Sequence, residues 1–273
     1  MSRRTILIFT LSTLVLLGLV AGLFTGSMEM ALGAPQGPQM MANMQGMPQT
    51  QGNRQANTPG ATPQGTAPIK NNQQNQQMNI LATDTFQRQD QALWGIASDG
   101  RQWGGDANAK DFFTIKGGKG QIAGGQGALE AVIGLPTDNV DVTISGTVNQ
   151  FGNNVNLGTV LRWRDTNNWY KAFIGGNQLS ILKSVNGKPT IIVQTNVKTD
   201  PGVAQTLRFR VFGTTLFAKV WPSATTEPQK WMLVADDHTF ATGQFGIRVF
   251  EQPTTVITIT SFNAATAAMG NTI

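Results

Sequence analysis

The chain has 273 residues, with 20 basic and 15 acidic side chains, a net charge of +5 and no cysteine. The absence of cysteine excludes a disulfide-stabilised domain and a bacterial lipoprotein anchor, which needs a lipid-modified cysteine. From Asn79 onward there are 16 basic and 14 acidic residues and no concentrated basic stripe, so nucleic acid is not an expected partner.

Residues 1–24 have the pattern of a signal anchor or signal peptide. Arg3 and Arg4 precede an uncharged, mostly apolar run over residues 5–24. At about 1.5 Å per residue this run is long enough to cross a ~30 Å hydrocarbon core. Basic residues before the run favour an N-terminus in the cytoplasm, so the rest of the chain is expected outside the membrane, anchored or secreted. The length of the run favours an uncleaved anchor, and small residues near Gly33 leave cleavage open.

Residues 25–78 are predicted to be a disordered linker. The segment is rich in Gln, Asn, Pro, Gly and Met, and it contains no aromatic residue. Such a composition cannot build a core, and a flexible chain of this length holds a domain ~40 Å from its attachment point. A Met-rich tract for Cu(I) or for a partner is the alternative, but the methionines have no regular spacing and no accompanying His or Cys.

Residues 79–265 read as an all-β domain, followed by a flexible tail over residues 266–273. Short β-branched and aromatic runs alternate with Gly, Asn, Asp and Pro turns, and no long stretch has a helical apolar period. The pattern predicts a two-sheet antiparallel jelly-roll sandwich. The expected strands are 112–116, 120–123, 127–133, 140–149, 156–164, 168–174, 178–184, 190–195, 205–212, 215–221, 243–250 and 255–263.

Two local patterns support antiparallel strands with one buried face. Asn186-Gly187 lies between two apolar runs and predicts a type I′ hairpin turn, which needs positive φ at both central residues. In residues 205–212, alternation places Leu207, Phe209 and Val211 on the core face and two arginines on the solvent-exposed face.

The segment from Leu161 to Lys183 is the candidate binding face, because aromatic and basic residues gather there. Alternation assigns Trp163 to the core and leaves open which face of residues 169–174 is buried. The candidate ligand-binding residues are Arg162, Arg164, Trp169, Tyr170 and Lys171. Trp94 and Trp103 flank a glycine-rich loop and are added as residues that either rim the site or cover the core. The alternative is a solvated basic face with the aromatic side chains filling the sandwich.

No catalytic residue and no metal ligand is assigned. His238 is the sole histidine and lies in a polar turn beside two aspartates, without a second His or any Cys to complete a transition-metal site. The glutamates of the domain, Glu130, Glu227 and Glu251, are far apart in sequence. Calcium held by aspartates is left open, although no EF-hand spacing supports it; the aspartates considered are Asp84, Asp99, Asp106 and Asp165.

An ordered set of motifs spans most of residues 79–265. It runs from DTFQR at 84–88 and WG at 94–95 through LRWRDTNNWYKAFI at 161–174 to LRFRVFGTTLFAKVW and GQFGIRVF. This set resembles the concanavalin A-like lectin/glucanase superfamily, in its laminin-G-like branch of exported bacterial domains. The resemblance implies a jelly roll that takes carbohydrate, sometimes with calcium. The catalytic branch carries a Glu-x-Asp-x-x-Glu strand motif, which this sequence lacks.

The predicted function is therefore a non-catalytic cell-surface module that binds carbohydrate or another envelope polymer, tethered to the membrane by its N-terminal segment. One alternative is a glycoside hydrolase whose acids converge from distant strands, since cleavage needs two carboxyl groups within about 5–10 Å. The other is a structural or adhesion domain that contacts protein.

Overall fold

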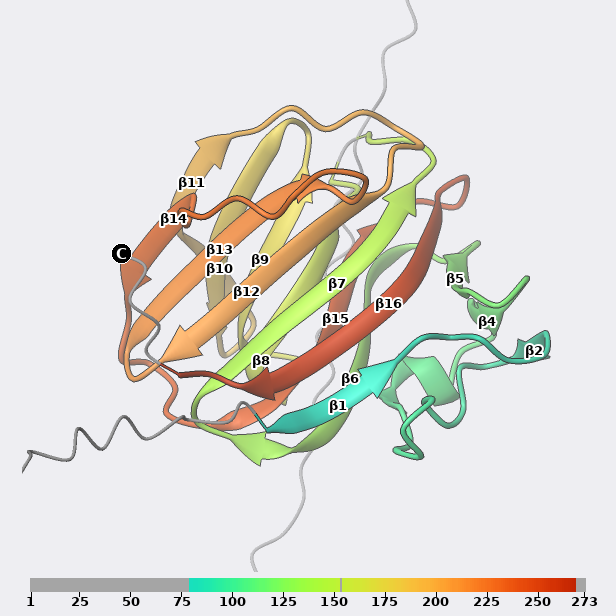
Figure 1. Cartoon of the computed structure of the whole chain (residues 1–273), viewed down its shortest axis with the longest axis horizontal. Helices are drawn as coiled ribbons and strands as arrows, with labels where there is room; N and C mark the ends of the chain where they lie inside the picture. Colours follow the sequence, from blue (N-terminus) through green and yellow to red (C-terminus); the bar gives the residue numbers. More distant parts are fainter. Residues whose placement is uncertain (1–78, 153, 269–273) are drawn as a thin grey trace, which may run out of the picture. The chain divides into compact units, whose positions relative to one another are not determined.

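The computed structural model describes residues 79–152 and 154–268, and it shows two antiparallel sheets packed face to face (Figure 1). The predicted anchor (1–24), the predicted linker (25–78) and residues 269–273 of the predicted tail lie outside the described residues. Within the described part of the chain, no helix has both the length and the apolar character that a membrane span requires.

Each sheet is built from strands that are distant in sequence. The nine-stranded sheet has the order β14 (Leu233–Asp236), β13 (Thr215–Pro222), β12 (Gln205–Phe212), β7 (Val140–Val148), β16 (Val256–Thr266), β5 (Gly120–Ala123), β4 (Phe113–Ile115) and β2 (Gln91–Ala92), with β1 (Ile80–Asp84) also paired to β16. The seven-stranded sheet has the order β11 (Lys188–Asn196), β10 (Gln178–Val185), β9 (Asn168–Gly175), β8 (Leu157–Asp165), β15 (Gly243–Glu251), β6 (Gly127–Thr137) and β3 (Gly104–Gly105).

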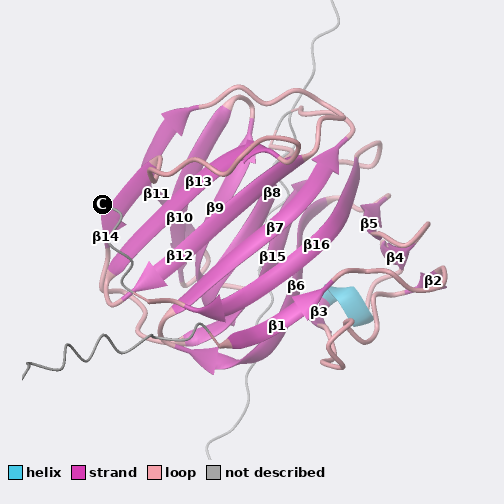
Figure 2. Ribbon diagram, viewed as in Figure 1, coloured by secondary structure: helices cyan, strands magenta, loops and turns pink. Residues whose placement is uncertain are grey.

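The all-β prediction is confirmed in the described region. Every strand pair is antiparallel, and the helix drawn in Figure 2 is a single 3₁₀ turn, η1 (Asp106–Asn108). All twelve predicted strands are present. The sequence did not predict the short strands β1, β2, β3 and β14, because each depends on a partner strand that local composition does not reveal.

The core lies between the sheets, and alternation supplies it from both sides. Leu207, Phe209 and Val211 of β12 are fully buried, as predicted, while Arg208 and Arg210 face outward. On the seven-stranded sheet the inward residues come from alternate positions of β8, β9, β10 and β15; they include Leu157, Leu161, Tyr170, Ile174, Ile181 and Ile247. Burial of this apolar surface is the main stabilising contribution of the fold.

The hairpin turns of the seven-stranded sheet use residues that tolerate positive φ. Asn186 and Gly187 join β10 to β11 with φ of 50° and 76°, which confirms the prediction for this turn. The neighbouring turn between β9 and β10 is centred on Gly176 and Asn177, with φ of 58° and 65°. These two turns lie at opposite ends of β10 and bound the outer face that carries the candidate site.

Candidate functional site

A cleft of about 610 Å³ lies on the outer face of the seven-stranded sheet. Strand β9 contributes Trp169, Lys171 and Phe173 to it, because Tyr170, Ala172 and Ile174 point into the core. Strand β15 contributes Arg248 and Phe250, and the segment before β8 contributes Asn156. The cleft therefore combines aromatic, cationic and amide groups from elements that are distant in sequence.

A small apolar cluster outside the main core lies on this face of the sheet, and Trp169 and Leu182 of this cluster line the cleft. Val132, Val160 and Trp169 form this cluster, with Trp163 and Leu182 packed against it. The Arg248 guanidinium lies 4.6 Å from the centre of the Trp169 ring, a cation–π distance. Arg248 also forms an ion pair with Glu130 of β6. The ion pair and the indole together hold Arg248 in position at the cleft.

Lys171 is buried in the cleft with 5% of its surface exposed. Its Nζ donates to Asn156 Oδ1 at 2.6 Å and lies 5.1 Å from the centre of the Phe173 ring. Burial, and then the nearby positive charge of Arg248, lower the pKa of Lys171 well below its usual value. The lysine crosses Gly158, where an added Cβ atom would lie 2.6 Å from Lys171 Cε and 2.8 Å from the backbone carbonyl oxygen of Ala172, so this position of β8 requires glycine.

Glu130 lies behind Arg248 on β6. Burial raises the pKa of Glu130, and the attraction of Arg248 only partly offsets this effect. Trp163 Nε1 donates to Glu130 Oε2 at 3.2 Å, and the backbone N–H of Glu130 donates to Asp106 Oδ2 at 3.0 Å. The negative charge of Asp106 also acts to raise the pKa of Glu130, so these two acidic residues, 24 positions apart in sequence, lie near each other.

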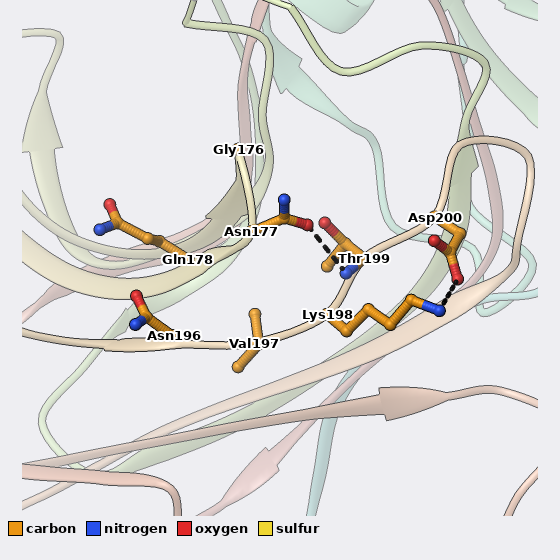
Figure 3. Close-up of a pocket in the computed structure, with 8 residues that line it drawn as sticks. All are labelled: Gly176, Asn177, Gln178, Asn196, Val197, Lys198, Thr199 and Asp200. Carbon is orange, nitrogen blue, oxygen red and sulfur yellow. Dashed lines mark hydrogen bonds and ion pairs between the residues drawn. The ribbon is translucent and has the colours of Figure 1, made fainter.

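A second hollow, of about 620 Å³, adjoins the cleft at the β9–β10 turn (Figure 3). Gly176 and Gln178 line both spaces. Beyond them, Asn177 points toward Thr199, whose backbone N–H donates to the Asn177 Oδ1 at 3.4 Å. The hollow is lined mainly by polar residues, and its position offers a long ligand a continuation from the cleft.

Of the seven predicted ligand-binding residues, the structure places Trp169 and Lys171 in the cleft. The side chain of Tyr170 lies in the core, where its hydroxyl donates to Asp237 Oδ1 at 2.6 Å. Arg164 is exposed, lies over the Phe240 ring at 5.2 Å and does not line the cleft. The site supported by the geometry therefore omits Tyr170 and Arg164.

Trp94 and Trp103 cover the core and do not rim the cleft. They are 0% and 1% exposed, and their rings contact each other edge to face at 5.1 Å. Trp103 Nε1 donates to Asp84 Oδ2 at 2.8 Å, and Asp84 also forms an ion pair with Arg88. The DTFQR and WG motifs therefore have a structural explanation, in which a buried carboxylate organises the aromatic end of the sandwich.

Arg162 is buried and binds backbone carbonyls. Its guanidinium donates to the carbonyl oxygens of Asp138, Gly213 and Phe240, at 2.5 to 3.1 Å. The residue has φ of 47° and lies where the pairing register of β8 shifts. This bulge reverses the alternation after Leu161. As a result, the prediction that Trp163 lies in the core is wrong, because its indole packs on the outer face beside Glu130.

Sequence reasoning missed Arg248, Asn156 and Phe250 as lining residues. A signal for Arg248 exists, since Phe245, Ile247 and Val249 alternate inward along β15 and leave residue 248 facing outward. No comparable signal marks Asn156, which pairs with Phe250 across a single bridge outside the named strands.

The aspartates considered for calcium each have protein partners. Asp99 pairs with Arg101, Asp106 with Lys110, and Asp165 accepts hydrogen bonds from Asn167 and Asn168. In the part of the chain that the structure describes, no group of three His, Cys, Asp or Glu side chains has an arrangement that suits a metal ion.

Comparison with known proteins supports the fold. No family model matches the chain, and no curated protein matches it. A xylan β-1,4-xylosidase from Bacillus halodurans C-125 aligns with a TM-score of 0.51 and 13% identity, over 67% of this chain and 38% of that one. The GH43 protein BlXynB from Bacillus licheniformis aligns with a TM-score of 0.51 and 12% identity, over 68% of this chain and 39% of that one. The carbohydrate binding module CBM66 from Bacillus subtilis aligns with a TM-score of 0.43 and 18% identity, over 52% of this chain and 85% of that one. The chain thus spans about two fifths of the length of the two larger proteins, and it shares a β-sandwich fold with them.

Proposed function

We propose that this protein is an exported, membrane-anchored jelly-roll module that binds carbohydrate without cleaving it. The observation that carries the proposal is the cleft on the seven-stranded sheet, which gathers an indole, two phenyl rings, two cations and amide groups on one face. Binding pockets for small organic ligands typically combine an apolar floor with a few fixed polar groups. Sugar rings offer both an apolar face and hydroxyl groups, so they match this lining.

The adjoining hollow supports a polymer as the ligand. Cleft and hollow share Gly176 and Gln178, so a chain of sugar units bound in the cleft has room to continue past the β9–β10 turn. The sequence pattern of residues 1–24 favours a position at the cell surface, where such polymers occur. One protein that shares the fold over part of its length is a xylan β-1,4-xylosidase, so xylan oligosaccharides are sensible first probes.

A glycan-array screen of the full-length chain tests the proposal. Ala128 is exposed and lines the cleft, so Ala128→Trp is expected to fill the cleft and to abolish binding of the array glycans that the unmodified chain retains. The matched control is Ala92→Trp, since Ala92 is an exposed strand residue of the other sheet. Equal binding by both variants, or no binding by the unmodified chain, would contradict the proposal.

A second candidate function is glycoside hydrolysis, favoured by the Glu130 and Asp106 pair and by the raised pKa of Glu130. Two observations count against hydrolysis. The Trp163 indole and the Arg248 guanidinium both donate to Glu130 Oε2, and neither Glu130 nor Asp106 lines the cleft. Incubation of the retained glycans with the protein decides between the two functions. New reducing ends that disappear in Glu130→Gln would establish the hydrolase instead.

A further inference from the structure

The cleft holds a buried lysine that lacks an acidic partner. Among the described residues, the buried cationic side chains are Arg162, Lys171, Lys219 and Arg248. Arg248 pairs with Glu130, and Lys219 pairs with Glu227 at 2.7 Å. Arg162 donates to three backbone carbonyls. Within the described region, Lys171 has one hydrogen-bond partner, the neutral amide of Asn156, although an ammonium group carries three donors.

Lys171 is held in this position by its surroundings. Asn156 Oδ1 also accepts the backbone N–H of Phe250 at 3.1 Å, and Asn156 Nδ2 donates to the carbonyl oxygen of Asn154 at 3.0 Å. The amide that binds the ammonium is thus fixed by two further contacts. Gly158 provides the room in which the lysine stem lies flat against the sheet. A lysine normally extends its ammonium into water, so this arrangement restrains the group inside the cleft.

The position of Lys171 is energetically unfavourable in the ligand-free protein. Burial of a cation without a counter-ion is unfavourable, and the neighbouring guanidinium of Arg248 adds like-charge repulsion. An anionic group of a ligand would relieve both effects at once. In a ligand that otherwise presents hydroxyl groups and an apolar ring face, a carboxylate on the sugar ring is the group that supplies this charge.

We propose that the cleft selects carbohydrates that contain hexuronic acid, and that a ring carboxylate of the ligand pairs with the Lys171 ammonium beside Arg248. This inference rests on the proposed carbohydrate-binding function and specifies the class of ligand. Asn156 acts as a positioning residue that holds the ammonium, and Trp169 and Phe173 supply the apolar surface next to it.

Calorimetric titration of the full-length chain tests the inference with matched ligands. Oligogalacturonate and oligomannuronate are each compared with their carboxyl-reduced forms, which keep the same linkages without the charge. At least one acidic oligomer is expected to bind about 10- to 100-fold more tightly than its reduced form, the range for a hydrogen-bonded charge pair. Lys171→Met is expected to remove this preference, whereas Lys119→Met, in the exposed β4–β5 turn, keeps it.

A measurement on the unmodified chain makes the test independent of how the variant folds. Arg248 of β15 is the charged group that acts on Lys171, and both Asn156 and Phe173 are neutral. Burial and Arg248 lower the pKa of Lys171, and a bound carboxylate would raise it again. Carboxylate binding is therefore expected to be accompanied by proton uptake at Lys171, seen as a binding enthalpy that changes with the ionisation enthalpy of the buffer. The reduced oligomers are expected to show no such change.

The outcomes separate the two proposals. Equal binding of acidic and reduced oligomers, or a preference that survives in Lys171→Met, would overturn the inference and leave carbohydrate binding intact. A preference for other, neutral glycans on the array would do the same. The absence of binding to any glycan would overturn the proposed function and the inference together.

Discussion

Tyr170 is the only tyrosine of the chain, and the side of the sheet on which its side chain lies was only partly predictable from the sequence. Alternation correctly separates Trp169, Lys171 and Phe173 from Tyr170, Ala172 and Ile174. It does not tell which set faces the core, since both sets contain an aromatic residue. The decision depends on partners that are distant in sequence: the Tyr170 ring packs against Phe240, and its hydroxyl binds Asp237.

Ionisation of Tyr170 provides a test of this buried position. Burial, and then the hydrogen bond to Asp237, raise its pKa to about 12. The folded pKa exceeds the unfolded value of ~10, so the protonated Tyr170 hydroxyl stabilises the folded state. This stabilisation is complete below pH ~10 and is lost as the pH rises toward about 12. Spectrophotometric titration of tyrosinate, with a denatured sample as reference, is expected to show the native group titrating about two units higher. Native titration near pH 10 would place Tyr170 at the surface.

At the scale of elements, the strand pattern was predictable and the bulge in β8 was not. Period-two alternation locates β8 and β9, but the extra residue at Arg162 reverses the outward face over the last part of β8. Strand β15 approaches the bulge closely. A Cβ atom on Gly243 would lie 2.3 Å from the carbonyl carbon of Arg162. Tertiary contact therefore sets the position of Trp163, and the local sequence carries no signal for it.

Substitution of Gly243 tests this account of the bulge. Gly243→Ala is expected to lower the free energy of unfolding by ~3 kcal/mol, the upper part of the range for overpacking, because the clash is with backbone atoms. Gly152→Ala is the matched control, since no atom of the described residues would lie within 4 Å of its Cβ, and it is expected to change the free energy by less than ~0.5 kcal/mol. Denaturant unfolding measures both values. Equal stabilities would contradict the close approach of β15 and β8.

At the scale of the whole molecule, the two outer faces differ in how their charges are balanced. On the nine-stranded sheet, Arg208 and Arg210 share Asp141, and Lys219 pairs with Glu227, so the cations around Trp231 have acidic partners. On the seven-stranded sheet, Lys171 has none among the described residues. The fold class follows from the repeated short strands, whereas this asymmetry depends on which distant strands become neighbours. The expectation that residues 1–24 place the sandwich outside the membrane stays a prediction.

Hydrogen exchange of the full-length chain, with and without a bound glycan, tests whether the outer face of the seven-stranded sheet binds the ligand. Ligand binding is expected to slow amide exchange in the segments that line the cleft, residues 154–156, 166–169 and 187–189, and to leave the strands under Trp231 unchanged. Protection centred on β12 and β13 of the nine-stranded sheet, with none at the cleft, would show that the ligand binds elsewhere.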